Sequence, residues 1–406
     1  LYTWPLAWKI TDQTRRRLEA QTIFEAYRLR HIASQSSTQS RYLYLTSWAG
    51  LANRILAFLS AFVLALLTDR VLLLSESIFS DAQLFLKPFD WEARNWPQFL
   101  AARDDNEAAV RGTTSEWAVI DTEARPFTPT LTTLVCGDVN ATFPQRTLEL
   151  RSIGQYLVPI LLLNPRAVVL RRALGVAPFM SLSQFLLRPA TSFEERLQSA
   201  SLCWGDARAS DDGGVGLQVR MHNVDVRAGS PTLLQWASRC AVLLSHETNG
   251  HQEQSVSRFY IATDDLEARQ ILTKQLSRVA PVQMLQHKPF AELANNVSDA
   301  WLELLQLSRC SRLVTTGAST FGFVARGLSR TPINRQRYLT GWTGADAASF
   351  ESERHCTRVR SREPCLMHAW RQDWNVEQLA CFSRSRLPSH TIQQLIRPLD
   401  PASQCF

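Results

Sequence analysis

The pattern of apolar and polar positions divides the chain into two regions in which strands and helices alternate. In the first region, an alternating stretch at residues 42–46 predicts a strand and a small-residue loop follows at 47–50. A long apolar run over about 51–68 then predicts a buried helix, and residues 71–74 predict the next strand, which together form a strand–helix–strand unit. Further helices are predicted near residues 165–174, 181–187 and 192–201.

The second region alternates more regularly. Strands are predicted at residues 215–221, 258–263, 282–285 and 312–316, and helices at 231–244, 265–276, 299–308 and 320–328. Short strands alternating with helices predict a parallel, doubly wound sheet, whose ligand site lies beyond the carboxyl ends of the strands. The predicted fold class is therefore α/β, with two Rossmann-like domains facing a central crevice. This is the GT-B arrangement of glycosyltransferases.

The length of 406 residues also suits two domains. Residues 1–40 combine a charged amphipathic stretch with a Ser/Gln/Thr-rich segment, which indicates a stem or linker. We expect an N-terminal, acceptor-side domain over residues 41–205 and a nucleotide-binding domain over 206–345. Residues 346–406, which contain several cysteines, are expected to pack back on the core.

The formal net charge of +7 comes almost entirely from arginine, since only four of the 44 basic residues are lysine. Two interpretations remain open: a codon-usage habit with charge spread over the surface, or a surface that attracts anionic ligands such as nucleotide diphosphates. The chain has no basic block interleaved with aromatic residues and no zinc-finger spacing, so nucleic-acid binding is not favoured.

The eight cysteines include no C-x-x-C pair, which argues against structural zinc and thioredoxin chemistry. N-glycosylation sequons occur at Asn140 and Asn296, and with the even cysteine count they favour an oxidising secretory compartment. The apolar run at 55–67 is too short to span a bilayer and indicates a buried helix. Any membrane anchor is expected upstream of Leu1.

Three segments that carry polar residues stand at the carboxyl ends of predicted strands. Arg220 belongs to the first segment, residues 216–223, where its guanidinium could bind a diphosphate or pair with a local acid. Thr263 and Asp264 belong to the second, residues 261–265, where the carboxylates either cap the next helix or accept from a base or ribose.

The third segment leads through Ser319, Thr320, Phe321 and Gly322 into a helix. Free backbone N–H groups at a helix start bind phosphate, although Ser319 could equally be an ordinary N-cap. In the first region, Asn53 and Arg54 stand at the start of the long helix, where they either cap it or face the crevice.

Several familiar motifs are absent from the sequence. No Asp-x-Asp occurs, which favours arginine and backbone amides over a metal ion as the groups that neutralise a diphosphate. No Gly-x-Ser-x-Gly and no Walker A motif occurs, so hydrolase and P-loop functions lack their usual marks.

Taken in order, these segments resemble the plant-type cell-wall fucosyltransferases, the family of xyloglucan fucosyltransferase. The resemblance is collinear over roughly residues 42–382. The matching segments are residues 44–55, 65–73, 84–89, 155–159, 216–220, 300–303, 313–316 and 319–325, followed by Cys356 and Cys365.

The resemblance implies an inverting α-1,2-fucosyltransferase that moves L-fucose from GDP-fucose to a galactose-containing cell-wall polysaccharide or glycoprotein glycan, without a metal. It also implies a type II protein of the Golgi lumen that meets the membrane only through its anchor. A homodimer is a further expectation. Arg220 corresponds to the arginine that binds the GDP diphosphate, and Ser319, Thr320 and Phe321 to part of the GDP site. Asn53 and Arg54 correspond to residues of the acceptor side. The donor-binding candidates are completed by Gly50, His222, Thr263, Asp264 and Gly322.

Two departures from the family pattern matter. The family has an acidic residue just before the segment at 155–159, where this chain has Gly154, and Ala52 stands where glycine is usual. A glycosyl centre that ionises readily needs only weak deprotonation of the acceptor, and His222, Asp225 and Glu363 are candidate bases. Two alternatives remain: an inactive relative that binds glycan or nucleotide, which Gly154 motivates, and a transferase that uses another donor sugar.

Overall fold

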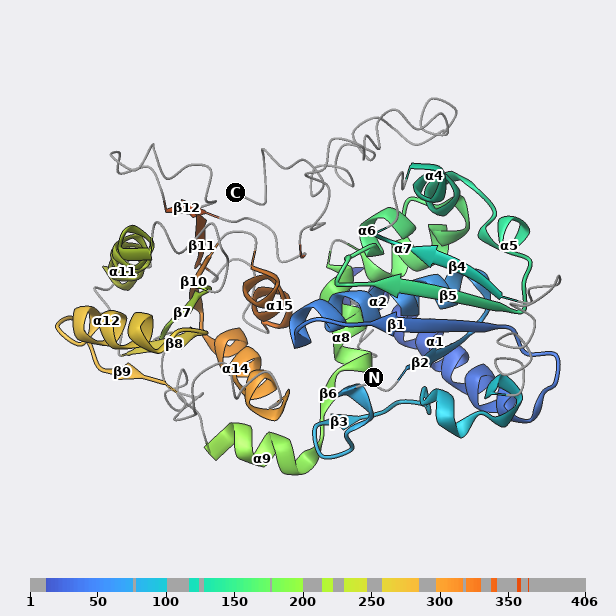
Figure 1. Cartoon of the computed structure of the whole chain (residues 1–406), viewed down its shortest axis with the longest axis horizontal. Helices are drawn as coiled ribbons and strands as arrows, with labels where there is room; N and C mark the ends of the chain where they lie inside the picture. The colour runs from blue at the N-terminus through green and yellow to red at the C-terminus, as the bar shows by residue number, and fades with distance from the viewer. Residues whose placement is uncertain are drawn as a thin grey trace, which may run out of the picture.

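The computed structural model consists of two α/β domains joined side by side (Figure 1). It describes residues 12–75, 78–100, 117–123, 128–175, 177–199, 214–221, 230–246, 258–284, 297–316, 319–329, 337–341, 356–358 and 364.

The N-terminal domain is built on a parallel four-stranded sheet in the order β2-β1-β5-β4. Its strands are β1 (Tyr42–Ser47), β2 (Val71–Leu74), β4 (Trp117–Asp121) and β5 (Thr147–Ser152). Tyr42 is in register with Val71 on one side and Thr147 on the other. The chain moves outward from β1 to β2 in one direction, and β5 and β4 lie in the other direction. The strand order therefore reverses between β1 and β5, and such a switch point is where ligands bind in open α/β sheets.

Helix α2 (Leu51–Thr68) follows β1 and is the central helix of this domain, with Ile55–Ala65 fully buried. It is long and apolar enough to cross a membrane by length and composition, but 72% of it is buried inside the protein. The apolar contacts that surround it explain its composition, as the sequence predicted.

In place of the stem or linker expected for residues 1–40, residues 12–33 form helix α1 (Asp12–Ala33), which packs on the N-terminal domain. Its buried residues Ala20, Phe24, Tyr27 and His31 recur at helical spacing along one face. Tyr27 Oη donates to Arg70 O at 3.0 Å and accepts from Leu72 N at 2.8 Å. The many arginines on the other faces of α1 concealed this apolar stripe in the sequence.

His31 makes the docking of α1 sensitive to pH. Burial lowers the pKa of its imidazole to about 4, against the hydrogen bond to Leu72 O and the charge of Asp90, which raise it. The unfolded chain therefore takes up a proton below about pH 6.5 that the folded protein does not take up until pH 4. We expect the melting temperature to fall as the pH drops from 6.5 to 4, and to fall less steeply in His31→Phe. Parallel melting curves for the two proteins would contradict this.

The remaining elements of the domain surround the sheet. Its helices are α4 (Thr128–Cys136), α5 (Val139–Thr142), α6 (Val158–Leu161), α7 (Val168–Leu174), α8 (Pro178–Leu186) and α9 (Thr191–Ser199), with 3₁₀ turns at Ser34–Ser36, Ile78–Ser80, Ala93–Asn95 and Pro165–Ala167. Strands β3 (Phe85–Leu86) and β6 (Arg188–Pro189) pair antiparallel in a separate two-stranded sheet.

The C-terminal domain is built on a six-stranded sheet in the order β12-β11-β10-β7-β8-β9. Its strands are β7 (Val215–Val219), β8 (Phe259–Thr263), β9 (Val282–Gln283), β10 (Arg312–Thr316), β11 (Arg337–Gly341) and β12 (Thr357–Arg358). All pairs are parallel except β11 with β12. The strand order reverses between β7 and β10, which gives this domain its own switch point.

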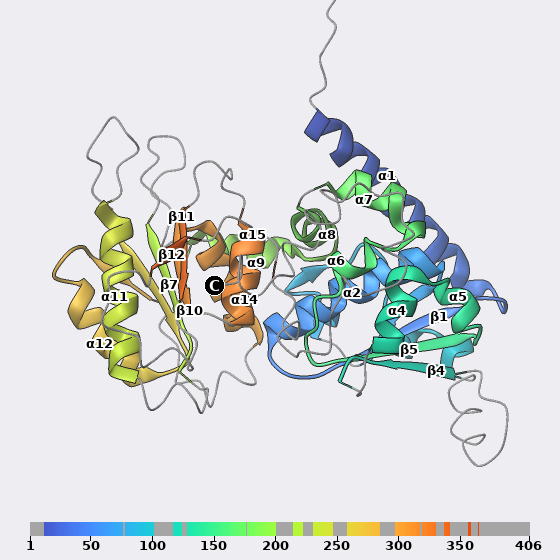
Figure 2. The same cartoon turned by 90° about the horizontal axis from the view of Figure 1, so that it is seen from above.

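Two helix layers cover this sheet (Figure 2). Helices α11 (Ser230–His246) and α12 (Leu266–Leu276) pack on the outer face around Leu233, Ala237 and Leu272. Helices α14 (Val297–Arg309) and α15 (Thr320–Leu328) lie between the sheet and the N-terminal domain and belong to the same hydrophobic core as α2.

The two domains contact each other closely through α15. A Cβ atom added at Gly327 would lie 2.4 Å from Phe179 Cδ1 of α8, so glycine permits this approach. Trp301 of α14 packs against Phe85 with ring centroids 5.1 Å apart. Through these contacts, the α14–α15 layer and the N-terminal domain share one hydrophobic core.

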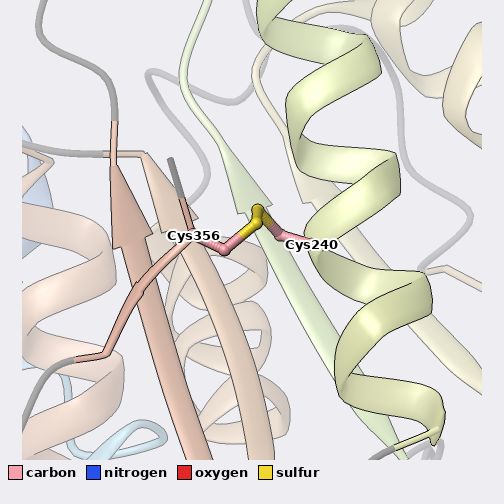
Figure 3. Close-up of a disulfide and its surroundings, with 2 residues drawn as sticks. All are labelled: Cys240 and Cys356. Carbon is pink, nitrogen blue, oxygen red and sulfur yellow. A yellow bond between two sulfur atoms is a disulfide. The ribbon is translucent and has the colours of Figure 1, made fainter. Parts of the chain in front are cut away.

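A disulfide between Cys240 of α11 and Cys356 attaches the segment of β12 to the body of the C-terminal domain (Figure 3). The sequence predicted that Cys356 and Cys365 are both oxidised. The partner of Cys356 is Cys240, and Cys365 lies outside the described residues. The bond closes a loop with a sequence separation of 116 residues.

Cys356→Ser is expected to destabilise the protein by about 2–5 kcal/mol, because a long loop loses its cross-link in the unfolded state. Thermal unfolding of the variant, alongside the oxidised and reduced wild type, measures this change. An unchanged melting temperature on both substitution and reduction would show that the disulfide contributes nothing to stability.

Candidate functional site

The carboxyl ends of β10, β7 and β8 meet at the switch point of the C-terminal sheet. Val219, Thr263 and Thr316 are their last residues, so the segments that follow the three strands lie next to one another. The candidates Arg220, Thr263 and Asp264 are thereby brought together, as the parallel sheet predicted.

Arg220 is fixed on two sides. Its backbone N–H donates to Thr316 Oγ1 at 3.0 Å, and Arg220 Nε lies 3.3 Å from Asp264 Oδ2. The side chain of Arg220 is 42% exposed, whereas that of Asp264 is 6% exposed. Arg220 thus pairs with a local acid, which is one of the two roles that the sequence suggested. Its side chain nevertheless stays partly exposed. Pairing and ligand binding are therefore compatible here.

The two acids after β8 have different structural roles. Asp265 caps α12, since its Oδ1 accepts from Ala268 N at 2.7 Å. Asp264 instead accepts from Met221 N at 2.7 Å and pairs with Arg220. Helix capping therefore accounts for Asp265 and not for Asp264, which orients the segment that carries Arg220.

Helix α15 begins at the same switch point. Ser319 is its N-cap residue by backbone conformation, but the hydroxyl makes no capping hydrogen bond. Ser319 Oγ is buried without a hydrogen-bond partner among the residues that the structure describes, and Ser319 N donates to Thr316 O at 3.3 Å. Thr320 is half-buried, and Phe321 packs against the hydrophobic core shared by the two domains. Ser319 and the first turn of α15 therefore lie at the switch point, and phosphate binding there stays a prediction.

Gly322 allows α15 to lie directly on the sheet. A Cβ atom at this position would be 2.8 Å from Thr315 Cβ and 2.9 Å from Gln218 Oε1. Gln218 Oε1 is itself buried and has no hydrogen-bond partner in the described part of the chain. A side chain at Gly322 would therefore push the start of α15 away from Arg220 and its strand.

The N-terminal sheet presents a second group at its own switch point. Gly50 is the N-cap of α2, and a Cβ atom there would meet nothing within 4 Å. Asn53 and Arg54 are half-buried in the first turn, and Arg54 Nε donates to Ala49 O at 2.8 Å. Arg54 therefore stabilises the loop before α2. Trp48, in that loop, is 45% exposed.

Gly154, the position at which the family's acid is missing, contacts Asn53. Its φ of +136° is a conformation that side-chain-bearing residues rarely adopt, and a Cβ atom would lie 2.6 Å from Asn53 Cβ. The turn is held by Ser152 Oγ, which accepts from Gly154 N at 3.2 Å and from Gln155 N at 3.0 Å. Glycine is thus a structural requirement of this turn as it is built here.

Two acids near this turn escaped prediction, because strands β4 and β5 were not identified in the sequence. Burial alone raises the pKa of the Glu149 carboxyl, but hydrogen bonds from Arg151, Thr46 and Trp117 outweigh it and lower the pKa. Glu123 follows the carboxyl end of β4, and its Oε1 accepts from Gln155 Nε2 at 3.2 Å. A predicted strand at 117–121 would have placed Glu123 at this edge.

The described candidates thus form two groups. Arg220, Asp264, Thr263, Ser319 and Gly322 lie together in the C-terminal domain, and Gly50, Asn53 and Arg54 lie in the N-terminal domain. Helices α15 and α2, which begin within the two groups, pack against each other. His222, Asp225 and Glu363 lie outside the described residues.

Two doubly wound domains joined through one helix layer define the class of protein: the chain has the GT-B fold. The fold agrees with that of a mutant of Arabidopsis thaliana FUT1 in complex with GDP, at a TM-score of 0.58 and 20% identity, covering 90% of this chain and 86% of that one. The fold class predicted from the sequence is confirmed.

The sequence comparisons lead to a particular family. Residues 14–157 match the family model described as xyloglucan fucosyltransferase. The chain is 24% identical over 376 residues to the galactoside 2-alpha-L-fucosyltransferase of Pisum sativum, an alignment that covers 81% of this chain and 63% of that protein. The chain therefore spans less than two thirds of the length of that relative. The predicted resemblance to this fucosyltransferase family is confirmed.

Proposed function

We propose that this chain is an inverting fucosyltransferase that moves L-fucose from GDP-fucose to a galactose-containing glycan. The observation that carries the proposal is the group of residues at the β7–β10 switch point of this GT-B fold. Arg220, Ser319 and the first turn of α15 lie together there. The match to the fucosyltransferase family and the similarity to a GDP-bound fucosyltransferase support GDP-fucose as the donor.

The chemistry follows from the charge that develops on the leaving group. As the bond between the anomeric carbon and the diphosphate breaks, negative charge accumulates on GDP. The partly exposed side chain of Arg220, held by Asp264, and the backbone amides of the first turn of α15 would stabilise it through fixed dipoles and charge. These groups need little reorganisation, because hydrogen bonds to the strands already hold them.

The acceptor is proposed to bind at the N-terminal switch point, beside Asn53 and the exposed Trp48. The α-1,2 linkage to galactose is proposed from the galactoside 2-alpha-L-fucosyltransferase relative. A location in the Golgi lumen is proposed from the family resemblance, and the Cys240–Cys356 disulfide supports an oxidising compartment. The type II anchor and the homodimer stay predictions.

A donor-by-acceptor screen tests the proposal. The protein is incubated with GDP-fucose, GDP-mannose and UDP-galactose against galactosylated glycans and xyloglucan, and products are read by mass spectrometry with linkage analysis. We expect fucose transfer to terminal galactose from GDP-fucose alone. Transfer from another donor would replace the proposed donor sugar.

The competing function is that of an inactive relative that binds glycan or nucleotide, which the absence of the family's acid at Gly154 favours. Binding of GDP without turnover on any acceptor in the same screen would establish it. Isothermal titration with GDP separates this outcome from a protein that binds no nucleotide at all.

A further inference from the structure

We infer that Glu123 is the general base of the transfer, supplying from strand β4 the carboxylate that Gly154 cannot provide. The inference rests on the proposed function and assigns the residue that accepts the proton from the acceptor hydroxyl.

The position of Glu123 follows from the order of the N-terminal sheet. Strand β4 pairs with β5 in parallel, with Asp121 in register with Arg151. Glu123 lies two residues beyond that pair, on the same carboxyl edge as the turn at 153–155. Because β5 borders the switch point, the segment after β4 reaches the acceptor side from the next strand along.

Hydrogen bonds direct Glu123 toward the place of the missing acid. Its backbone N–H donates to Asp121 Oδ1 at 2.8 Å, and Thr122 N and Oγ1 donate to Arg151 O at 3.0 and 3.1 Å. Glu123 Oε1 accepts from Gln155 Nε2 at 3.2 Å. Gln155 directly follows Gly154, whose Cα faces Asn53. The carboxylate is therefore held by the side chain of the residue that follows Gly154 and by Thr122 Oγ1, which donates to Glu123 Oε1 at 3.2 Å.

The neighbouring carboxylates are unsuited to the task. Glu149 is 8% exposed at its side chain and is occupied by hydrogen bonds from Arg151, Thr46 and Trp117, which lower its pKa. Asp121 Oδ1 accepts the backbone N–H of Glu123. Glu123 is half-buried and therefore less enclosed than Glu149, and its Oε1 is held by Gln155 Nε2 and Thr122 Oγ1.

The proposed step is a single displacement. The acceptor hydroxyl oxygen forms a bond to the anomeric carbon of fucose, the bond from that carbon to the diphosphate oxygen breaks, and its electron pair leaves on GDP. The hydroxyl proton passes to the Glu123 carboxylate. A carboxylate is a sufficient base, because the oxocarbenium-like centre reacts before full deprotonation is needed.

Glu123→Gln tests the inference, since glutamine keeps the size and the acceptor oxygen for Gln155 and removes the base. We expect kcat to fall about 10²-fold, at the lower end of what general bases contribute, with an unchanged KM for GDP-fucose and unchanged GDP affinity. Glu123→Asp should retain more activity than Glu123→Gln. Glu25→Gln, which removes an exposed carboxylate on α1, is the matched control and should be fully active.

The pH profile separates a base from a structural residue. The charged groups that hydrogen bonds place beside this segment are Asp121 on its own strand, and Arg151 on β5 with its partner Glu149. In the wild type, kcat should decline at acid pH as the base is protonated, and Glu123→Gln should lose that decline. An acid limb that persists in Glu123→Gln would belong to another group and would overturn the inference.

The outcomes distinguish this inference from the proposed function. If the wild type transfers fucose and Glu123→Gln does so at the same rate, the base is assigned wrongly and the fucosyltransferase stands. If Glu123→Gln loses GDP affinity and melting temperature together with its activity, the role of Glu123 is structural and the inference fails. If the wild-type protein transfers nothing from GDP-fucose, the proposed function is wrong, and the inference about Glu123 fails with it.

Discussion

Arg220→Ala is expected to reduce fucose transfer from GDP-fucose to about one hundredth of the wild-type rate or less, while the protein stays folded. Losing one preorganised group that stabilises developing negative charge costs on the order of 10²–10³ in kcat. The truncation also removes the charge that faces Asp264, whose side chain is 6% exposed, so the melting temperature should fall moderately, although Met221 N still donates to Asp264 Oδ1. Initial rates with GDP-fucose, together with thermal unfolding, measure both effects.

Two further variants make this experiment specific. Arg220→Lys keeps the charge and loses the fork that binds two oxygens at once, so we expect an intermediate rate. Arg196→Ala is the matched control, because Arg196 is 46% exposed and pairs with Asp299 at 2.5 Å, much as Arg220 pairs with Asp264. It should transfer fucose normally. A folded Arg220→Ala protein with normal turnover would remove Arg220 from the donor site.

The elements that the sequence predicted correctly are apolar segments with small or charged residues on both sides. Helices α2 (Leu51–Thr68) and α15 (Thr320–Leu328) and strand β2 (Val71–Leu74) have the predicted bounds, because small or charged residues flank their apolar runs. The candidates in the C-terminal domain followed from this, since adjacent parallel strands bring their carboxyl ends together. Position along the strands was sufficient to find Arg220 and Asp264.

The elements that were not predicted contain charges whose partners are distant in sequence. Strand β5 carries Glu149, which is buried only because Thr46, Trp117 and Arg151 hydrogen-bond it. Helix α1 has an apolar face hidden among arginines. Neither feature can be read from local pattern, since the compensating contacts form only in the fold. Without β4 and β5, Glu123 could not be placed at the edge of the sheet.

The same limit applies to Gly154. From the sequence alone, Gly154 suggests that an acid, and with it activity, has been lost. In the structure, Gly154 is in close contact with Asn53 in a turn with φ of +136°, and the carboxylate of Glu123 binds the next residue. These two interpretations make opposite predictions for a protein in which the acid is restored.

Gly154→Asp is expected to lower stability without raising transfer. The backbone strain of a side-chain-bearing residue at this φ costs about 1–3 kcal/mol. The new Cβ atom, 2.6 Å from Asn53 Cβ, adds an overpacking cost of about 1–3 kcal/mol. The melting temperature should therefore fall by several degrees, and displacement of Asn53 should raise the KM for the acceptor.

Two companion variants separate the causes of this loss. Gly50→Ala adds a Cβ atom that meets nothing within 4 Å at a φ of −68°, and its melting temperature should not change. Adding Asn53→Gly to Gly154→Asp removes the Cβ atom that the new side chain would strike and should recover part of the lost stability. If Gly154→Asp instead transfers fucose faster than the wild type at an unchanged melting temperature, the turn accepts an acid there. The transfer base would then belong at position 154 and not at Glu123.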